Sequence, residues 1–126
     1  MKTKHLFYSL LIAFAIMLFF FFMQPFFYFA AFFGLIVTIL GIMLIIKARK
    51  IKNKPARRFL YLTGVGASGI LVCSILHNLV YALFIVLFGQ GFWKDEPVFF
   101  IIALIICPLL FLIGTIGTFF NLKKIK

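Results

Sequence analysis

The stretch that decides the fold of this chain is residues 59–88, FLYLTGVGASGILVCSILHNLVYALFIVLF. It contains no charged residue over 30 positions, a length that predicts a membrane-spanning helix. It also carries His77 and Asn78 deep inside an apolar run, together with a dense set of small residues. Residues 59–88 are therefore expected to hold the polar core of the protein and its closest helix contacts.

The composition of the 126-residue chain excludes a soluble domain. Hydrophobic residues make up 66% of it, 20 residues are Phe, and only Asp95 and Glu96 are acidic. The formal net charge of +11 could indicate a nucleic-acid partner, but the basic residues lie in short segments between apolar runs. That placement is typical of a membrane protein with several spans, so we expect the lipid bilayer as its partner and no nucleic acid.

Four apolar runs predict an all-α integral membrane protein, a single domain over residues 1–126 with four transmembrane helices in two hairpins. Residues 6 to 46 carry no charge, and a single helix of that length would extend roughly 60 Å, about twice the hydrocarbon thickness. The chain must turn back, and Pro25 marks the place because proline suits the first turn of a new helix. The expected helices cover residues 6–23, 26–46, 59–88 and 98–122.

The basic residues predict how the chain crosses the membrane. Of 13 Lys and Arg residues, two precede the first helix, seven lie in the loop of residues 47–58 and three follow the fourth helix. The positive-inside rule then predicts a protein of the plasma membrane with both termini and residues 47–58 in the cytoplasm. A basic loop beside a membrane also attracts anionic lipid, by about 1 kcal/mol for each basic residue near the surface.

Local signals mark the ends of the later helices. Asn53 is a candidate N-cap, so the third helix can begin before residue 59. Gly89 is the expected end of that helix, because glycine commonly follows a helix. The loop beyond it holds an expected interface anchor, Trp93, and an expected helix cap, Asp95 or Glu96.

Polar residues at helical spacing form what we call the wedge on the third helix. Its members are Cys73, Ser74, His77, Asn78 and Tyr81. Histidine titrates near neutral pH, so His77 is the best candidate for a proton relay inside the membrane. The simpler interpretation is a neutral imidazole that hydrogen-bonds across helices, and we favour it because the apolar runs offer no carboxylate partner.

Pro108 lies near the middle of the fourth expected helix and predicts a kink. A proline there cannot donate a hydrogen bond to the carbonyl of Leu104. Pro108 and His77 lie at similar depths from the outer ends of their helices, so the wedge can face the kink. A donor from Asn78 or Tyr81 is then a candidate partner for the Leu104 carbonyl.

Small residues predict where the last two helices approach each other. Gly66 and Gly69 lie on the third helix, and Gly114 and Gly117 lie on the fourth. Gly66 and Gly69 also belong to the pattern Gly64-x-Gly66-x-x-Gly69, which resembles a dinucleotide-binding loop in its letters. Because that pattern lies in an apolar helix and follows no expected strand, we interpret its glycines as a packing face.

These features favour a small non-enzymatic membrane protein, a subunit or accessory protein that packs with itself or with a larger membrane partner. The alternative is a small transporter or channel that uses the wedge around His77. No catalytic residue, cofactor or metal site is expected. Ser74 and His77 have no acid partner, and Cys73 with His77 supplies two metal ligands where a closed site needs more.

Overall fold

The computed structural model describes residues 1–90 and 97–125, which form helices joined by short connections. In chain order the elements are α1 (Thr3–Phe22), the 3-10 turn η1 (Gln24–Phe26), α2 (Phe27–Ala48), α3 (Lys54–Phe88), α4 (Pro97–Ile101), the π-helical turn η2 (Ile102–Ile106), α5 (Cys107–Asn121) and the 3-10 turn η3 (Leu122–Lys124). The last four elements are continuous, so the chain has four helices long and apolar enough to cross a membrane. The predicted all-helical class with four candidate spans is confirmed.

The third helix begins five residues earlier than residue 59, and a side-chain cap explains why. The Asn53 side chain accepts a hydrogen bond of 3.0 Å from the N–H of Ala56. Pro55 occupies the first turn, where its missing N–H leaves no helical hydrogen bond unmade. The predicted N-cap at Asn53 is therefore confirmed, as is the predicted end at Gly89, whose φ is 80°.

The central connection is shorter than the loop expected over residues 47–58. The α2 helix continues to Ala48, so residues 49–53 alone join α2 to α3. Ile51 turns inward from this connection and is 6% exposed, while its N–H donates to the carbonyl of Ala48. The expected anchor and cap at Trp93, Asp95 and Glu96 lie outside the described residues.

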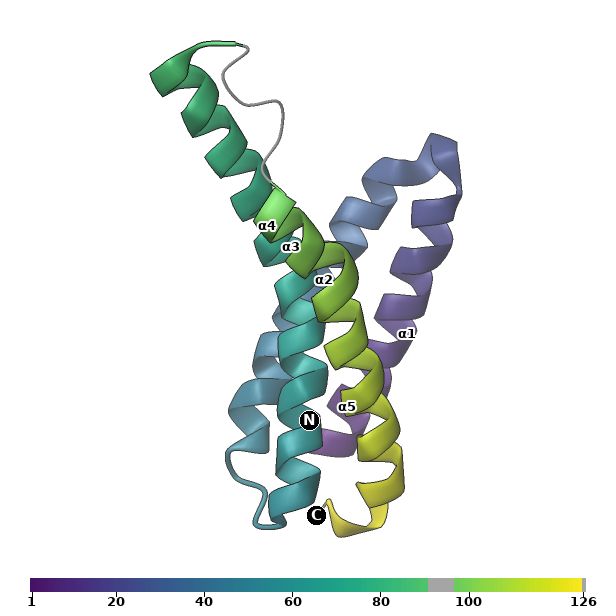
Figure 1. The fold of residues 1–126 in the computed structure, drawn as a ribbon. Helices are drawn as coiled ribbons and strands as arrows, with labels where there is room; N and C mark the ends of the chain where they lie inside the picture. The colour runs from purple at the N-terminus through teal and green to yellow at the C-terminus, as the bar shows by residue number, and fades with distance from the viewer. Residues whose placement is uncertain (91–96, 126) are drawn as a thin grey trace.

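The helices form a bundle that is closed at the end holding both chain termini and open at the other end (Figure 1). The α3 helix packs against both α2 and α5, and α1 packs against α2. Aromatic rings connect α1 to α5. Phe14 and Phe111 stack with centroids 4.1 Å apart, and the ring of Phe7 meets that of Phe119 at 5.4 Å. The four long helices therefore surround a common core.

That core lies at the closed end. Phe7 from α1, Leu44 from α2 and Leu60 from α3 are all 0% exposed. Toward the open end the tips of α1 and α3 diverge, and Phe22 and Val86 are 77% and 80% exposed. Apolar surface exposed on this scale suits contact with hydrocarbon, since water would penalise it heavily.

Glycines on two faces of α3 set how closely its neighbours approach. A Cβ built on Gly64 would lie 2.8 Å from the carbonyl oxygen of Gly41 in α2. A Cβ built on Gly66 would lie 2.5 Å from the backbone nitrogen of Phe111 in α5. Both obstacles are backbone atoms, which cannot move aside as a side chain can. The half of α3 nearer the closed end, its inner half, therefore fits between its neighbours only because these positions lack side chains.

We expect Gly66→Ala to destabilise the folded protein by about 1–3 kcal/mol, because overpacking a tight contact forces the backbone to shift. Gly34→Ala is the matched control, since a Cβ at Gly34 would meet the sulfur of Met17 at an ordinary 3.7 Å. The measurement is thermal unfolding of the purified chain in mild detergent. Equal unfolding temperatures for the two variants would contradict the packing described for α3.

Candidate functional site

All five residues of the wedge lie on α3, on the open-end side of its glycine contacts. Cys73, Ser74 and His77 are half-buried, whereas Asn78 and Tyr81 are exposed. The wedge thus occupies the part of α3 where the helix passes from the packed bundle to its more exposed outer half.

Two wedge residues use their side-chain donors within α3 itself. The hydroxyl of Ser74 donates to the carbonyl of Ile70 at 2.7 Å, and the Asn78 amide donates to the carbonyl of Ser74 at 2.9 Å. Such bonds to a carbonyl four residues earlier satisfy a polar side chain without a second helix. These groups can therefore lie in an apolar environment at little cost. The predicted bond from Asn78 or Tyr81 to Leu104 stays a prediction.

The His77 ring contacts the last span. Its ring lies 5.4 Å from the ring of Phe100 in α4, at an interplanar angle of 49°. This tilted contact joins α3 to α4 on the open-end side of the glycine contacts. It places the imidazole where it contributes to packing between the two helices.

Cys73 of α3 and Cys107 of α5 meet where the two helices pack together, Cys73 half-buried and Cys107 buried. The two thiols are neighbours, and neither cysteine forms a disulfide. A Cβ at Gly69 would lie 2.6 Å from the Cys107 sulfur, so glycine at this position makes room for the thiol. Within residues 1–90 and 97–125, no group of three or more His, Cys, Asp or Glu side chains is placed to hold a metal ion.

The helix changes its hydrogen-bonding pattern just before Pro108, and the kink predicted at this proline stays a prediction. Residues Ile102–Ile106 form a π-helical turn, and the N–H of Cys107 donates to the carbonyl of Ile102, five residues earlier. A π-helical turn shifts the hydrogen-bond ladder by one residue, so it accommodates the N–H that Pro108 lacks. The sequence indicates the proline but not this turn, since no residue pattern specifies a π-helical turn.

The four glycines singled out in the sequence all lie where α3 meets α5. Gly66 and Gly69 approach Cys107, one at its carbonyl oxygen and the other at its sulfur. A Cβ at Gly114 would collide with the backbone of α3, and one at Gly117 would collide with the ring of Phe59. The two glycine pairs therefore lie on facing surfaces of the two helices.

An apolar cleft of about 480 Å³ opens where the two halves of the bundle diverge, and the sequence analysis missed it. Ser74 of the wedge and Pro108 both line the cleft, and so do the stacked rings of Phe14 and Phe111. Small residues make up much of the remaining wall, namely Ala30, Ala31, Gly34, Ala67 and Ala103. The run of small residues in α2 is the sequence signal that could have indicated it.

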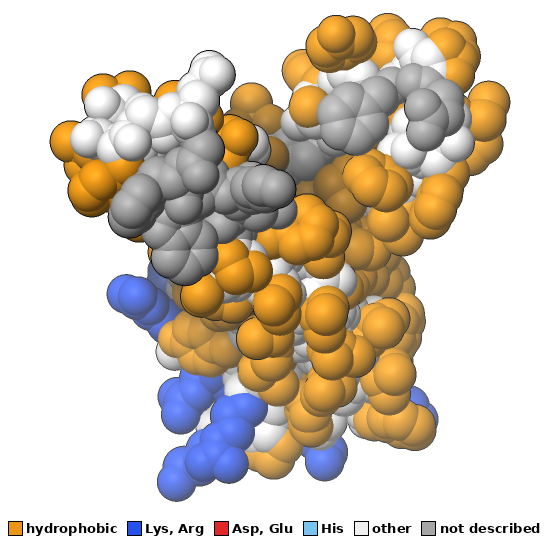
Figure 2. Space-filling view, turned by 45° about the horizontal axis from the view of Figure 1, so that its top comes forward, with side chains coloured by type: hydrophobic (Ala, Val, Ile, Leu, Met, Phe, Trp, Pro, Cys, Tyr) orange, Lys and Arg blue, Asp and Glu red, His pale blue; other side chains and the backbone are white. Residues whose placement is uncertain are grey.

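The surface of the molecule differs between the two ends of the bundle. Lys and Arg side chains gather at the closed end, and most of the remaining surface in this view is apolar (Figure 2). Together with four described helices long and apolar enough to span a membrane, this distribution suggests a helical membrane protein. No family model, curated protein or solved structure gives a significant match to this chain.

We expect His77→Gln to leave the stability of the folded chain nearly unchanged, because glutamine keeps a polar group at this position. His77→Ala should lower stability by about 0.6–2 kcal/mol, the usual contribution of a polar contact between membrane helices. The measurement is unfolding of each purified variant in mild detergent. An equal loss of stability in His77→Gln and His77→Ala would contradict the prediction that glutamine can replace the polar contact of His77.

A comparison of His77→Gln with the wild type also tests the proton relay. Glutamine does not titrate near neutral pH, so a relay through His77 would be abolished in His77→Gln even when the fold persists. We expect proton flux into liposomes to be equal for the wild type and His77→Gln, or absent from both. Flux that is lost in the folded variant alone would establish the transporter alternative.

Proposed function

We propose that this chain is a small non-enzymatic integral membrane protein that acts as a subunit or accessory protein. The observation that carries the proposal is the apolar cleft of about 480 Å³ at the open end of the bundle. In a bilayer such a cleft is filled either by lipid chains or by a helix of another chain. Its small wall residues favour a helix, because small side chains let two helix backbones come close together.

The occupant proposed for the cleft is a transmembrane helix of a second copy or of a larger membrane protein. Ala30, Ala31 and Gly34 present small residues from α2 on one wall of the cleft. A partner helix would cover surface that the chain leaves exposed on its own.

The charge distribution supports a place in the plasma membrane with both termini in the cytoplasm. The start of α1, the connection between α2 and α3 and the end of the chain lie at the same end of the bundle (Figure 1). Lys and Arg side chains gather there, and the positive-inside rule assigns such an end to the cytoplasm. The tips of the two proposed hairpins, α1 with α2 and α3 with the last span, then lie outside.

We expect a membrane-impermeant thiol reagent to label Gln90→Cys but not Lys52→Cys in intact cells. Both positions are exposed, and the proposed topology places the first outside and the second in the cytoplasm. The background carries Cys73→Ser and Cys107→Ser, which remove the native thiols. Labelling of Lys52→Cys in intact cells, checked against labelling after cell lysis, would contradict the topology.

We expect the wild-type protein in mild detergent to have a mass greater than one chain, and Ala31→Trp to reduce it to a single chain. The indole would occupy the cleft that Ala31 lines and exclude the partner helix. The measurement is size-exclusion chromatography with light scattering. Ala82→Trp is the control, because Ala82 is exposed on α3 but does not line the cleft. A single-chain wild type would exclude a second copy as the occupant, and equal disruption by both variants would contradict binding of a helix in the cleft.

A further inference from the structure

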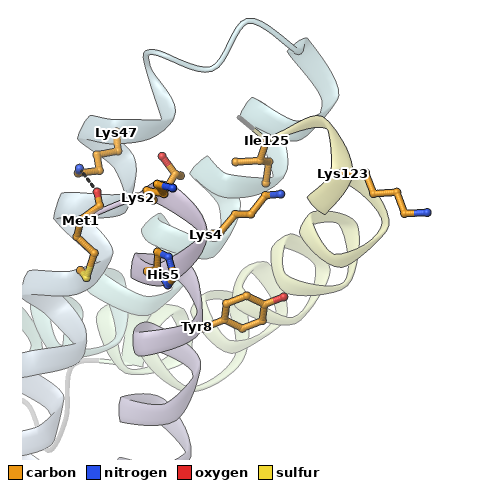
Figure 3. A pocket seen from close by; sticks show the side chains of 9 residues that line it. Met1, Lys2, Lys4, His5, Tyr8, Lys47, Lys123 and Ile125 are labelled. Atoms are coloured by element: carbon orange, nitrogen blue, oxygen red, sulfur yellow. Dashed lines mark hydrogen bonds between the residues drawn. The ribbon is translucent and has the colours of Figure 1, made fainter.

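A second cavity, of about 740 Å³, lies at the closed end of the bundle (Figure 3). Among the described residues, four lysines line it: Lys2 and Lys4 from the start of the chain, Lys47 from the end of α2, and Lys123 from η3. Three segments that are distant in the sequence thus bring positive charge to one space. None of the described residues that line this space is acidic, so the lysines give it a positive potential.

Contacts within the fold hold two of these lysines, Lys47 and Lys4, near the cavity. The Lys47 ammonium donates a hydrogen bond to the carbonyl of Met1, which connects the end of α2 to the start of the chain (Figure 3). Lys4 is half-buried and extends toward Ile125, which is itself 1% exposed. Two of the lysines are therefore held by segments that pack together, while Lys2 and Lys123 line the cavity as exposed side chains.

The first turn of α1 adds backbone donors to the same space. The first N–H groups of a helix have no partner within it, and the dipole of the helix favours negative charge there. Thr3, Lys4 and His5 come from this turn and line the cavity, and Lys2 at the N-cap position provides no side-chain hydrogen bond. Lysine charge and helix polarity thus favour the same kind of ligand, an anion with several acceptor oxygens.

Apolar surface continues from the cavity along α1 and α5. Tyr8 lines the cavity and is 43% exposed, and its ring lies 6.4 Å from that of Phe119, which is 47% exposed. Ile12, one helical turn beyond Tyr8, is 62% exposed. A positively charged space therefore adjoins an exposed apolar strip that runs toward the middle of the spans.

We propose that this cavity binds the phosphate-bearing headgroup of an anionic membrane lipid, with its acyl chains along Tyr8, Ile12 and Phe119. The lysines and the first turn of α1 recognise the phosphate oxygens, and the apolar strip recognises the chains. A free phosphate anion would use the charged part alone. The sequence indicates lipid attraction over the whole of residues 47–58, whereas Lys47 is the member of that segment that lines the cavity.

The test measures lipid binding to the purified full chain by native mass spectrometry in mild detergent. The probes are phosphatidylglycerol, phosphatidylcholine and soluble glycerol phosphate. We expect the wild type to prefer phosphatidylglycerol to the other two probes. The combined variant Lys2→Gln, Lys4→Gln and Lys123→Gln should bind phosphatidylglycerol at least about tenfold more weakly, because it removes three positive charges that line the cavity.

The matched control removes the same number of positive charges from exposed positions outside the cavity. It combines Lys50→Gln, Lys52→Gln and Lys54→Gln. We expect it to keep the affinity of the wild type. An equal loss in the control, no preference for phosphatidylglycerol over phosphatidylcholine, or equally tight binding of glycerol phosphate would each overturn the proposal. The assay contains no partner protein, so such a result would leave the proposed subunit role unaffected.

Discussion

The contact on which the rest of the structure depends is the approach of the α3 backbone to its neighbours at Gly64 and Gly66. Lipid tails are as apolar as leucine side chains, so helices in a bilayer gain little from hydrophobic burial and associate through close packing. A Cβ built on Gly66 would lie 2.5 Å from the backbone nitrogen of Phe111. Because Gly64 makes the same kind of approach to α2, the inner half of α3 is held on two sides and the outer half is left to diverge.

Polar side chains in these helices are largely satisfied within their own helix. Thr38 donates to Gly34 and Ser68 donates to Gly64, each at 2.8 Å, and Ser74 and Asn78 follow the same pattern of four residues. A polar group satisfied in this way needs no neighbouring helix, so the segments that carry it can separate without exposing an unpaired donor to hydrocarbon. The outer half of α3 can therefore carry the wedge and still stand apart from α1 and α2.

The two ends of the bundle present opposite chemistry. At the closed end four helix termini converge, and they bring the basic segments together around the cavity lined by Lys2, Lys47 and Lys123. Toward the open end the cleft between the diverging halves is lined mainly by small and apolar side chains. The closed end suits an anionic ligand at the membrane surface, and the open end suits an apolar partner within the bilayer.

The sequence by itself determined the four long apolar helices, the N-cap at Asn53 and the end of α3 at Gly89, because each depends on residues within a few positions of one another. It also indicated the glycines of α3 and α5, but not the backbone atoms that they face. Only the tertiary structure decided the π-helical turn before Pro108, the apolar cleft and the basic cavity. The cleft depends on the angle at which the two halves diverge, and the cavity joins Lys2 to Lys123, so neither is encoded in any single stretch of the chain.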